Sequence, residues 1–281
     1  MRRFRKFAGL TLVALALAAL FAPGHLRAIV FGWADTTNSF PNTGAFIVQS
    51  PTTGRIYPIC SGTLISPTVF LTAAHCTDYY INDLVPAGYT AYVSFDNPIP
   101  FGVLTSKQTR LIPVEQAIGD PQYNQAQSDP HDIAVLIVPE KATRGITPAT
   151  LPTAGLFDQL SAQNGLKTAV FTAVGYGIQD RVVGGGVPYY QDVNPIPRMY
   201  AFSSFNSING AWLRLSQNNA TGNGGTCYGD SGGPNFFQLD GVTIIAAITI
   251  TGDAVCESTN VDYRLDTDSA RGFLSAFVQL P

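Results

Sequence analysis

Charged side chains are scarce in this sequence. Asp, Glu, Lys and Arg make up 12% of its 281 residues, about half of the roughly 25% that is usual in soluble proteins. Glycine and proline are plentiful, at 27 and 19 residues, and aromatic residues reach 11%. This composition argues against a helical cytosolic protein and favours a β-rich extracellular one. The length suffices for one large domain or two medium domains with a real hydrophobic core.

Long apolar runs are absent from the sequence after its N-terminus. One long run, Phe7 to Ala22, follows a basic stretch at residues 2–6 and precedes small residues. Because the run is a little short for a membrane span, we interpret residues 1–28 as a secretory signal peptide. A retained N-terminal anchor is the alternative. We therefore expect a secreted protein, extracellular or periplasmic, with no membrane association once the signal is removed.

Positive charge is scarcer still without the signal. Residues 1–28 hold five basic and no acidic side chains, which leaves 11 basic and 19 acidic ones, a net charge of −8. This balance argues against nucleic acid or an anionic membrane as the main partner.

The four cysteines all follow the signal segment. An even number in an oxidising compartment predicts two disulfides. Three pairings are possible, and Cys60–Cys76 with Cys227–Cys256 is favoured because it joins cysteines that are near in sequence. A zinc site of Cys60, His75 and Cys76 is the alternative, although its spacing fits no zinc-finger pattern.

Short segments rich in β-branched and aromatic residues recur along the chain, with Pro, Gly, Asn or Asp between them. Strands are expected at 46–49, 62–65, 69–72, 91–95, 133–138, 169–174 and 242–251. Such segments predict antiparallel sheets, here divided near residues 145–155. Helical spacing of apolar residues is clear only from Ala270 to Val278, where Thr267 or Asp268 can cap the helix.

A serine lies among glycines in the segment Gly229-Asp230-Ser231-Gly232-Gly233. Glycines keep side chains away from the serine and let backbone N–H groups approach a reacting carbonyl, as an oxyanion hole requires. The serine hydroxyl still needs a base to act as a nucleophile. The segment also satisfies G-x-S-x-G, but that hydrolase fold places its histidine after the serine, and no histidine follows residue 131.

Histidine is rare, with three in the chain. His25 lies in the signal segment, His75 ends an apolar strand, and His131 is followed by Asp132 at the start of another apolar strand. A buried aspartate is costly unless it is paired, so Asp132 is a candidate to hold the imidazole of His75. His75 as an ordinary core histidine is the alternative, but the three segments together favour the catalytic interpretation.

Segments 72–76, 131–136 and 229–234, in this order, resemble the signature segments of the chymotrypsin/trypsin-like serine proteases. The resemblance runs from about Ile29 to Pro281. It implies an all-β fold of two six-stranded antiparallel β-barrels packed against each other, with a C-terminal α-helix. Residues 29–150 would form the first barrel and 151–281 the second.

This resemblance implies a secreted serine endopeptidase that hydrolyses peptide bonds through an acyl-enzyme. His75, Asp132 and Ser231 would be catalytic, and the N–H groups of Gly229 and Ser231 would form the oxyanion hole. A protein or peptide substrate, a monomer and no cofactor or metal are expected. The two proposed disulfides would brace the turns that bear His75 and Ser231.

The resemblance also suggests how the enzyme matures. Ile29-Val30 matches the new N-terminus of the family, whose α-amino group would pair with Asp230. Phe31 departs from the glycine that usually follows. Removal of residues 1–28 would itself expose Ile29; cleavage nearer Ala22, leaving a short propeptide, is the alternative.

Substrate-binding residues are expected at Gly225 and Thr226 and in the segment Ile250-Thr251-Gly252. Gly225, at the expected base of the primary pocket, carries no charge, so a neutral or apolar P1 side chain is expected. If Asp262 points into the pocket, basic specificity returns. Ile250 stands where the family commonly has a serine that binds the catalytic aspartate. A weak or inactive protease-like binding protein is therefore one alternative function. A serine esterase is another, because ester hydrolysis at the same site is an easier acyl transfer.

Overall fold

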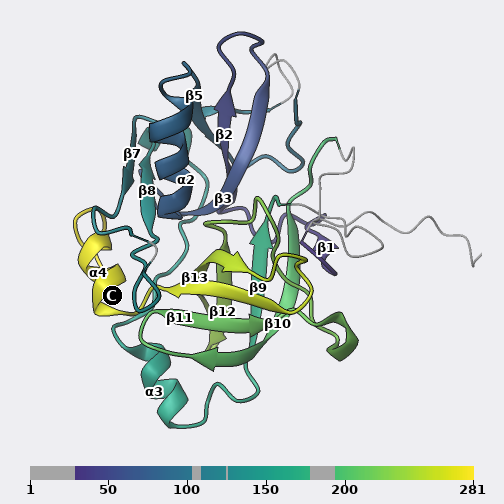
Figure 1. Ribbon diagram of the computed structural model, residues 1–281, viewed down its shortest axis with the longest axis vertical. Coiled ribbons are helices and arrows are strands. Elements are labelled where there is room, and N and C mark those ends of the chain that lie inside the picture. The colour runs from purple at the N-terminus through teal and green to yellow at the C-terminus, as the bar shows by residue number, and fades with distance from the viewer. Residues whose placement is uncertain (1–28, 103–108, 125, 178–193) are drawn as a thin grey trace, which may run out of the picture.

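The computed structural model describes residues 29–102, 109–124, 126–177 and 194–281. The predicted signal peptide, residues 1–28, lies outside the described residues. The described chain consists mainly of antiparallel strands in two sheets, with a few short helices (Figure 1). The predicted all-β class is therefore confirmed. None of the described helices is long and apolar enough to cross a membrane.

The first sheet has seven strands and occupies the upper half of Figure 1. Its order across the sheet is β6 (Ile112–Pro113), β5 (Thr90–Ser94), β2 (Thr43–Gln49), β3 (Ile56–Ser66), β4 (Val69–Thr72), β8 (Ala134–Ile137) and β7 (Gln116–Gly119). In the described part of the chain the edge strands β6 and β7 do not pair with each other. This half is thus an open half-barrel, and β6, with two residues, offers little edge to close it.

The second sheet has the order β1 (Trp33–Ala34), β10 (Met199–Ile208), β11 (Trp212–Ser216), β14 (Thr259–Arg264), β13 (Val242–Gly252), β12 (Pro234–Leu239) and β9 (Val170–Gly175). Because β9 pairs with both β12 and β10, six of these strands close into a barrel. The short strand β1 pairs with the first residues of β10. The first described residues are therefore attached to the second half of the fold (Figure 1).

Helices are short and lie between or beside the sheets. They are α2 (Ala74–Tyr79), which continues into the π-helical turn η2 (Tyr80–Leu84), η3 (Glu140–Ala142), α3 (Leu156–Ala162), η4 (Asn219–Thr221) and α4 (Asp268–Leu274). The hydroxyl of Thr267 caps α4 by accepting from the N–H of Ala270, as one of the two predicted caps. The helix ends at Leu274 and not at Val278, because the N–H groups of Ala276 and Phe277 bond to carbonyls three residues back.

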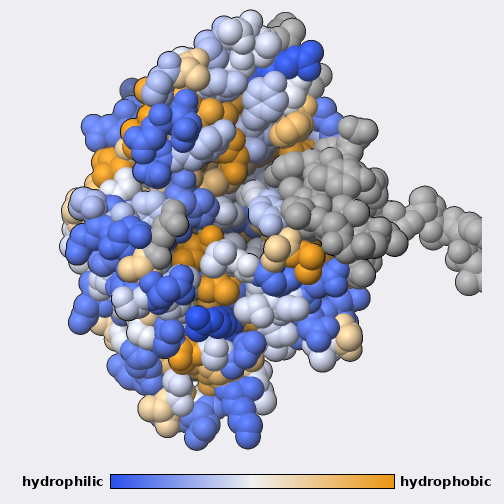
Figure 2. All heavy atoms as spheres, viewed as in Figure 1, coloured by the Kyte–Doolittle hydropathy of each residue, from blue (hydrophilic) through white to orange (hydrophobic). Residues whose placement is uncertain are grey.

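The largest hydrophobic cluster draws side chains from both sheets. Phe46 and Phe70 of the first sheet belong to the same cluster as Ile245, Ile248 and Tyr263 of the second. The two halves therefore share an apolar core where they meet. On the face shown in Figure 2, hydrophilic residues dominate the outer surface and apolar residues appear between them.

Candidate active site

The pairing of β4 with β8 brings His75 and Asp132 together. Thr72, the last residue of β4, pairs with Ala134, the first of β8, and the strands are antiparallel. Residues that follow β4 therefore lie opposite residues that precede β8. His75, in the first turn of α2, and Asp132, just before β8, meet for this reason.

Asp132 holds His75 at two points. One carboxylate oxygen accepts from the backbone N–H of His75 at 2.9 Å, and the other lies 2.8 Å from Nδ1 of the ring. The carboxylate can only accept, so Nδ1 of the neutral ring carries the proton and Nε2 keeps the lone pair. The Asp132 side chain is 9% exposed and that of His75 31%, which leaves the ring accessible to a substrate.

Ser231 comes from the other half of the molecule and reaches the same pocket. The pocket has a volume of about 340 Å³ and is lined by both His75 and Ser231. The carbonyl of Ser231 accepts from the N–H of Ser61 in β3 at 2.9 Å, which ties the serine loop to the first sheet. Among the described residues no hydrogen bond joins the Ser231 hydroxyl to His75; such bonds often tighten only when substrate binds.

The backbone on either side of Ser231 depends on glycine. Gly229 and Gly232 have φ values of 91° and 78°, which side chains rarely adopt. A Cβ on Gly232 would also overlap the hydroxyl oxygen of Thr72. Within the described residues the N–H groups of Gly229 and Ser231 donate to no protein acceptor, so both can serve a bound oxygen.

Asp230 is fully buried and directly precedes Ser231, the candidate nucleophile. Its two oxygens accept from the N–H groups of Cys227 at 2.9 Å and Gly177 at 2.8 Å. Burial raises the pKa of Asp230 to about 7, although both hydrogen bonds act to lower it. A carboxyl in such a place favours a cationic partner.

Ile29 and Val30 are docked in the second half of the fold. Ile29 is completely buried among Ala173, Met199 and Ala201. Val30 bridges to Gly225, whose N–H donates to the Val30 carbonyl at 3.0 Å.

Phe31 adopts a φ of 60°, in the left-handed region that costs a residue with a side chain about 1–2 kcal/mol. This conformation explains why glycine suits the position. The Phe31 ring packs against Val30, Cys227 and Cys256.

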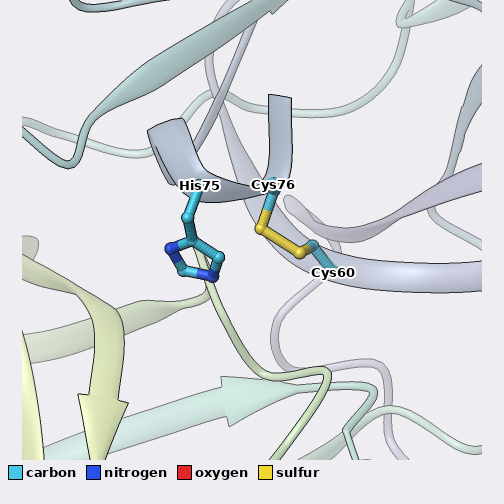
Figure 3. Close-up of side chains that lie close together, drawn as sticks. All are labelled: Cys60, His75 and Cys76. Carbon is cyan, nitrogen blue, oxygen red and sulfur yellow. A yellow bond between two sulfur atoms is a disulfide. The ribbon is translucent and has the colours of Figure 1, made fainter. Parts of the chain in front are cut away.

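Both predicted disulfides are present, Cys60–Cys76 and Cys227–Cys256. In Figure 3 the first lies beside His75 and joins α2 to β3, while the imidazole points to another side of the helix. The zinc alternative needed Cys60 and Cys76 as thiolates. Their sulfurs are bonded to each other, so this cluster does not fit a zinc site.

Four of the five expected substrate-binding residues, Thr226, Ile250, Thr251 and Gly252, line the pocket. Gly225 does not. It lies behind Thr226, where a Cβ would overlap the fully buried side chain of Gln217. Sequence reasoning missed Gln217, because it lies eight positions before Gly225, directly after the end of β11, and nothing local connects the two.

A buried polar network forms the layer behind the pocket wall. The hydroxyl of Thr226 donates to Asn260 at 2.6 Å, and Asn260 donates to Asn235 at 3.1 Å. Asn235 and Thr249 donate to one oxygen of Asp262 at 2.7 and 3.3 Å.

Asp262 is fully buried in this network and does not line the pocket. Its other oxygen has no hydrogen-bond partner among the described residues. Burial raises the pKa of Asp262 well above its ordinary value despite the hydrogen bonds from Thr249 and Asn235. Burial therefore opposes the charged form of Asp262, which limits its ability to attract a basic side chain.

Comparisons with known proteins agree on one family. The family model described as Trypsin matches residues 29–270. A trypsin of Phaedon cochleariae is 31% identical over 205 residues, 68% of this chain and 69% of that protein. Brachyurin of Leptuca pugilator is 30% identical over 85% of this chain and 96% of its own length. Spermosin of Halocynthia roretzi is 24% identical over 82% of this chain and 57% of its own length.

Proposed function

Since the chain belongs to the trypsin family of serine proteases, we propose that Ser231, His75 and Asp132 form its catalytic triad. The chain is a serine-type endopeptidase that acts on proteins or peptides. The observation that supports this triad is the double contact of Asp132 with His75, at 2.8 and 2.9 Å, beside a pocket shared with Ser231.

In the first half-reaction the Ser231 hydroxyl attacks the scissile carbonyl carbon. His75 takes the hydroxyl proton on Nε2, and Asp132 stabilises the resulting imidazolium. The tetrahedral intermediate collapses when the C–N bond breaks and His75 returns the proton to the leaving amine. The products are the free amine and an ester of Ser231, the acyl-enzyme.

In the second half-reaction water attacks the ester. His75 accepts a proton from the water and returns it to Ser231, which releases the carboxylic acid and restores the enzyme. The N–H groups of Gly229 and Ser231 bind the oxyanion in both halves, and each such donor contributes about 3–4 kcal/mol to the transition state.

The pocket is proposed to accept a neutral P1 side chain. Its walls at Thr226, Thr249 and Ile250 are uncharged. Asp253 also lines the pocket, but its carboxylate accepts from backbone N–H groups of its own loop at 2.8 and 3.0 Å. Burial opposes ionisation of Asp253, but these bonds outweigh it and lower its pKa, so the carboxylate is charged and the N–H groups of its own loop compensate that charge. A peptide library scanned at P1 tests this, and a preference for Lys or Arg would contradict it.

Maturation is proposed to occur by removal of residues 1–28 during secretion. The new α-amino group of Ile29 would be a cation close to the second barrel, and Asp230 is the buried carboxyl proposed to receive it. The buried position of Ile29 and the Val30–Gly225 bridge support this docking. Two disulfides also fit an oxidising compartment. Mass spectrometry of the secreted protein tests the idea, and a first residue other than Ile29 contradicts it.

A fluorophosphonate probe tests the triad directly. The processed wild-type protein is expected to be labelled, whereas Ser231→Ala and His75→Ala are not. Labelling of Ser231→Ala would place the nucleophile elsewhere. Unlabelled wild type with Ile29 at its N-terminus would reject the proposed triad.

A further inference from the structure

Ser61 connects the first sheet to two segments of the second half. It lies in the middle of β3 and is completely buried. Its hydroxyl donates to the carbonyl of Gly229 at 3.0 Å and accepts from the N–H of Tyr176 at 3.0 Å. Its own N–H donates to the carbonyl of Ser231 at 2.9 Å. Ser61 thus holds the carbonyls on both sides of Asp230, that of Gly229 through its hydroxyl and that of Ser231 through its backbone N–H.

The same residue is tied to the side of the site that carries the base. The carbonyl of Ser61 accepts from the hydroxyl of Thr72 at 2.9 Å, at the end of the strand that leads to His75. Its neighbour Cys60 is bonded to Cys76, which follows His75. Ser61 therefore lies between the elements that position the proposed base and the proposed nucleophile.

Space around Ser61 admits little more than its own side chain. A Cβ on Gly233 would lie 3.2 Å from Cβ of Ser61, and a Cβ on Gly175 would lie 3.0 Å from its hydroxyl oxygen. The hydroxyl has both of its neighbours at hydrogen-bonding distance and little freedom to rotate. Loss of this group would leave the buried N–H of Tyr176 without a partner, at a cost of about 1–3 kcal/mol.

The peptide unit that contains the Gly229 carbonyl is also held at its other end, where the N–H of Asp230 donates to the carbonyl of Cys227 at 3.0 Å. Because Gly229 has no side chain, the torsions at its Cα, where φ is 91°, are less restricted than those of other residues. We propose that Ser61 is a positioning residue for catalysis. By holding the Gly229 carbonyl, its hydroxyl limits rotation about the Cα–C bond of Gly229 and thereby keeps the preceding peptide unit, which carries the Gly229 N–H, directed at the substrate oxyanion. This inference rests on the proposed function, because it assumes the oxyanion hole of Gly229 and Ser231.

The test compares Ser61→Ala with wild type in kcat, KM and affinity for a peptide boronate, which forms a tetrahedral adduct with the nucleophile. We expect kcat to fall about 10- to 100-fold, since a donor misplaced by an ångström has an effect of this size. KM is expected to change little, and boronate affinity to fall with kcat. Thr143→Val is the control, because Thr143 is also a buried hydroxyl that donates to a carbonyl, that of Pro67, away from the pocket.

Three outcomes overturn the inference: kcat of folded Ser61→Ala within about twofold of wild type, a rise in KM alone, or an equal loss in Thr143→Val. Wild type without Ser231-dependent turnover overturns the proposed function as well, which separates the two failures. If Ser61→Ala does not fold, Ser61→Gly and Ser61→Cys are compared. The thiol is a weak donor of similar size, so the cysteine variant should retain more kcat, and equal values would refute the role.

Discussion

Replacing Asp132 by asparagine is expected to remove most activity by moving the proton on His75. In the structure one oxygen of Asp132 accepts from the backbone N–H of His75 and the other faces Nδ1. A backbone N–H can only donate, so the amide oxygen of the asparagine is held there and its NH₂ group faces Nδ1. Nδ1 must then accept, and the ring proton moves to Nε2. That nitrogen can no longer take the proton of Ser231.

The expected loss is about 10⁴-fold in kcat, which corresponds to roughly 5.5 kcal/mol of activation free energy. KM should change little, because Asp132 does not line the pocket. The free energy of unfolding should fall by less than about 1 kcal/mol, because asparagine has the same shape and keeps both contacts.

The assay is kcat and KM on a chromogenic peptide near neutral pH, together with thermal unfolding of each variant. Asp120→Asn is the matched control, because Asp120 is also buried and also lies beside an imidazole, 3.2 Å from Nδ1 of His131. Its kcat is expected to stay close to wild type. Retention of kcat within about tenfold in Asp132→Asn, or an equal loss in the control, would refute the tautomer argument.

Three further predictions concern the frame of the site. Gly232→Ala should lower the free energy of unfolding by at least about 1–2 kcal/mol, because the φ of Gly232 is 78° and the new Cβ would overlap the hydroxyl oxygen of Thr72. An unchanged melting temperature would contradict this prediction. In the uncleaved precursor the pKa of Asp230 is raised to about 7, so the folded state binds a proton that the unfolded state has lost, and stability should fall as pH rises from about 4 to 7. Asp230→Asn should flatten that part of the pH profile in urea titrations, and an unaltered slope would exclude Asp230 as its source. Replacing Cys60 and Cys76 by serine opens a loop that joins residues 16 positions apart. The free energy of unfolding, measured by calorimetry, should fall by about 3 kcal/mol. Unchanged stability would contradict a structural role for this disulfide.

The elements predicted from sequence are those whose pattern is local. β2, β4, β8 and β13 are rich in β-branched and aromatic residues, and each was expected. β10 was not, because polar residues interrupt its ten-residue span, yet it pairs on one side with β9 and on the other with β11. Its partners, and not its own pattern, make it a strand. α2 was missed because six residues are too short to display a helical period.

In the candidate site, too, some features are visible in the sequence and others depend on the tertiary structure. Ser231 among its glycines and Asp132 before an apolar strand are visible in sequence, because both depend on immediate neighbours. The position of Gly225 behind the pocket wall, and the burial of Asp262 in a network with Asn235, were not predictable. Asn235 and Asp262 are separated by 27 residues and meet only because β12, β13 and β14 are neighbours in the barrel.

By itself the sequence determined the reaction class, the order of the proposed catalytic residues and the cysteines available for pairing, because these follow from residue types and short spacings. Only the tertiary structure decided which groups share the site. The register of β4 on β8 brings Asp132 to His75, and the contact between the sheets brings Ser61 to the loop of Ser231. These contacts join residues 57 and 168 positions apart along the chain. Hydrogen bonds over such separations depend on how the strands pair, and no local pattern records that.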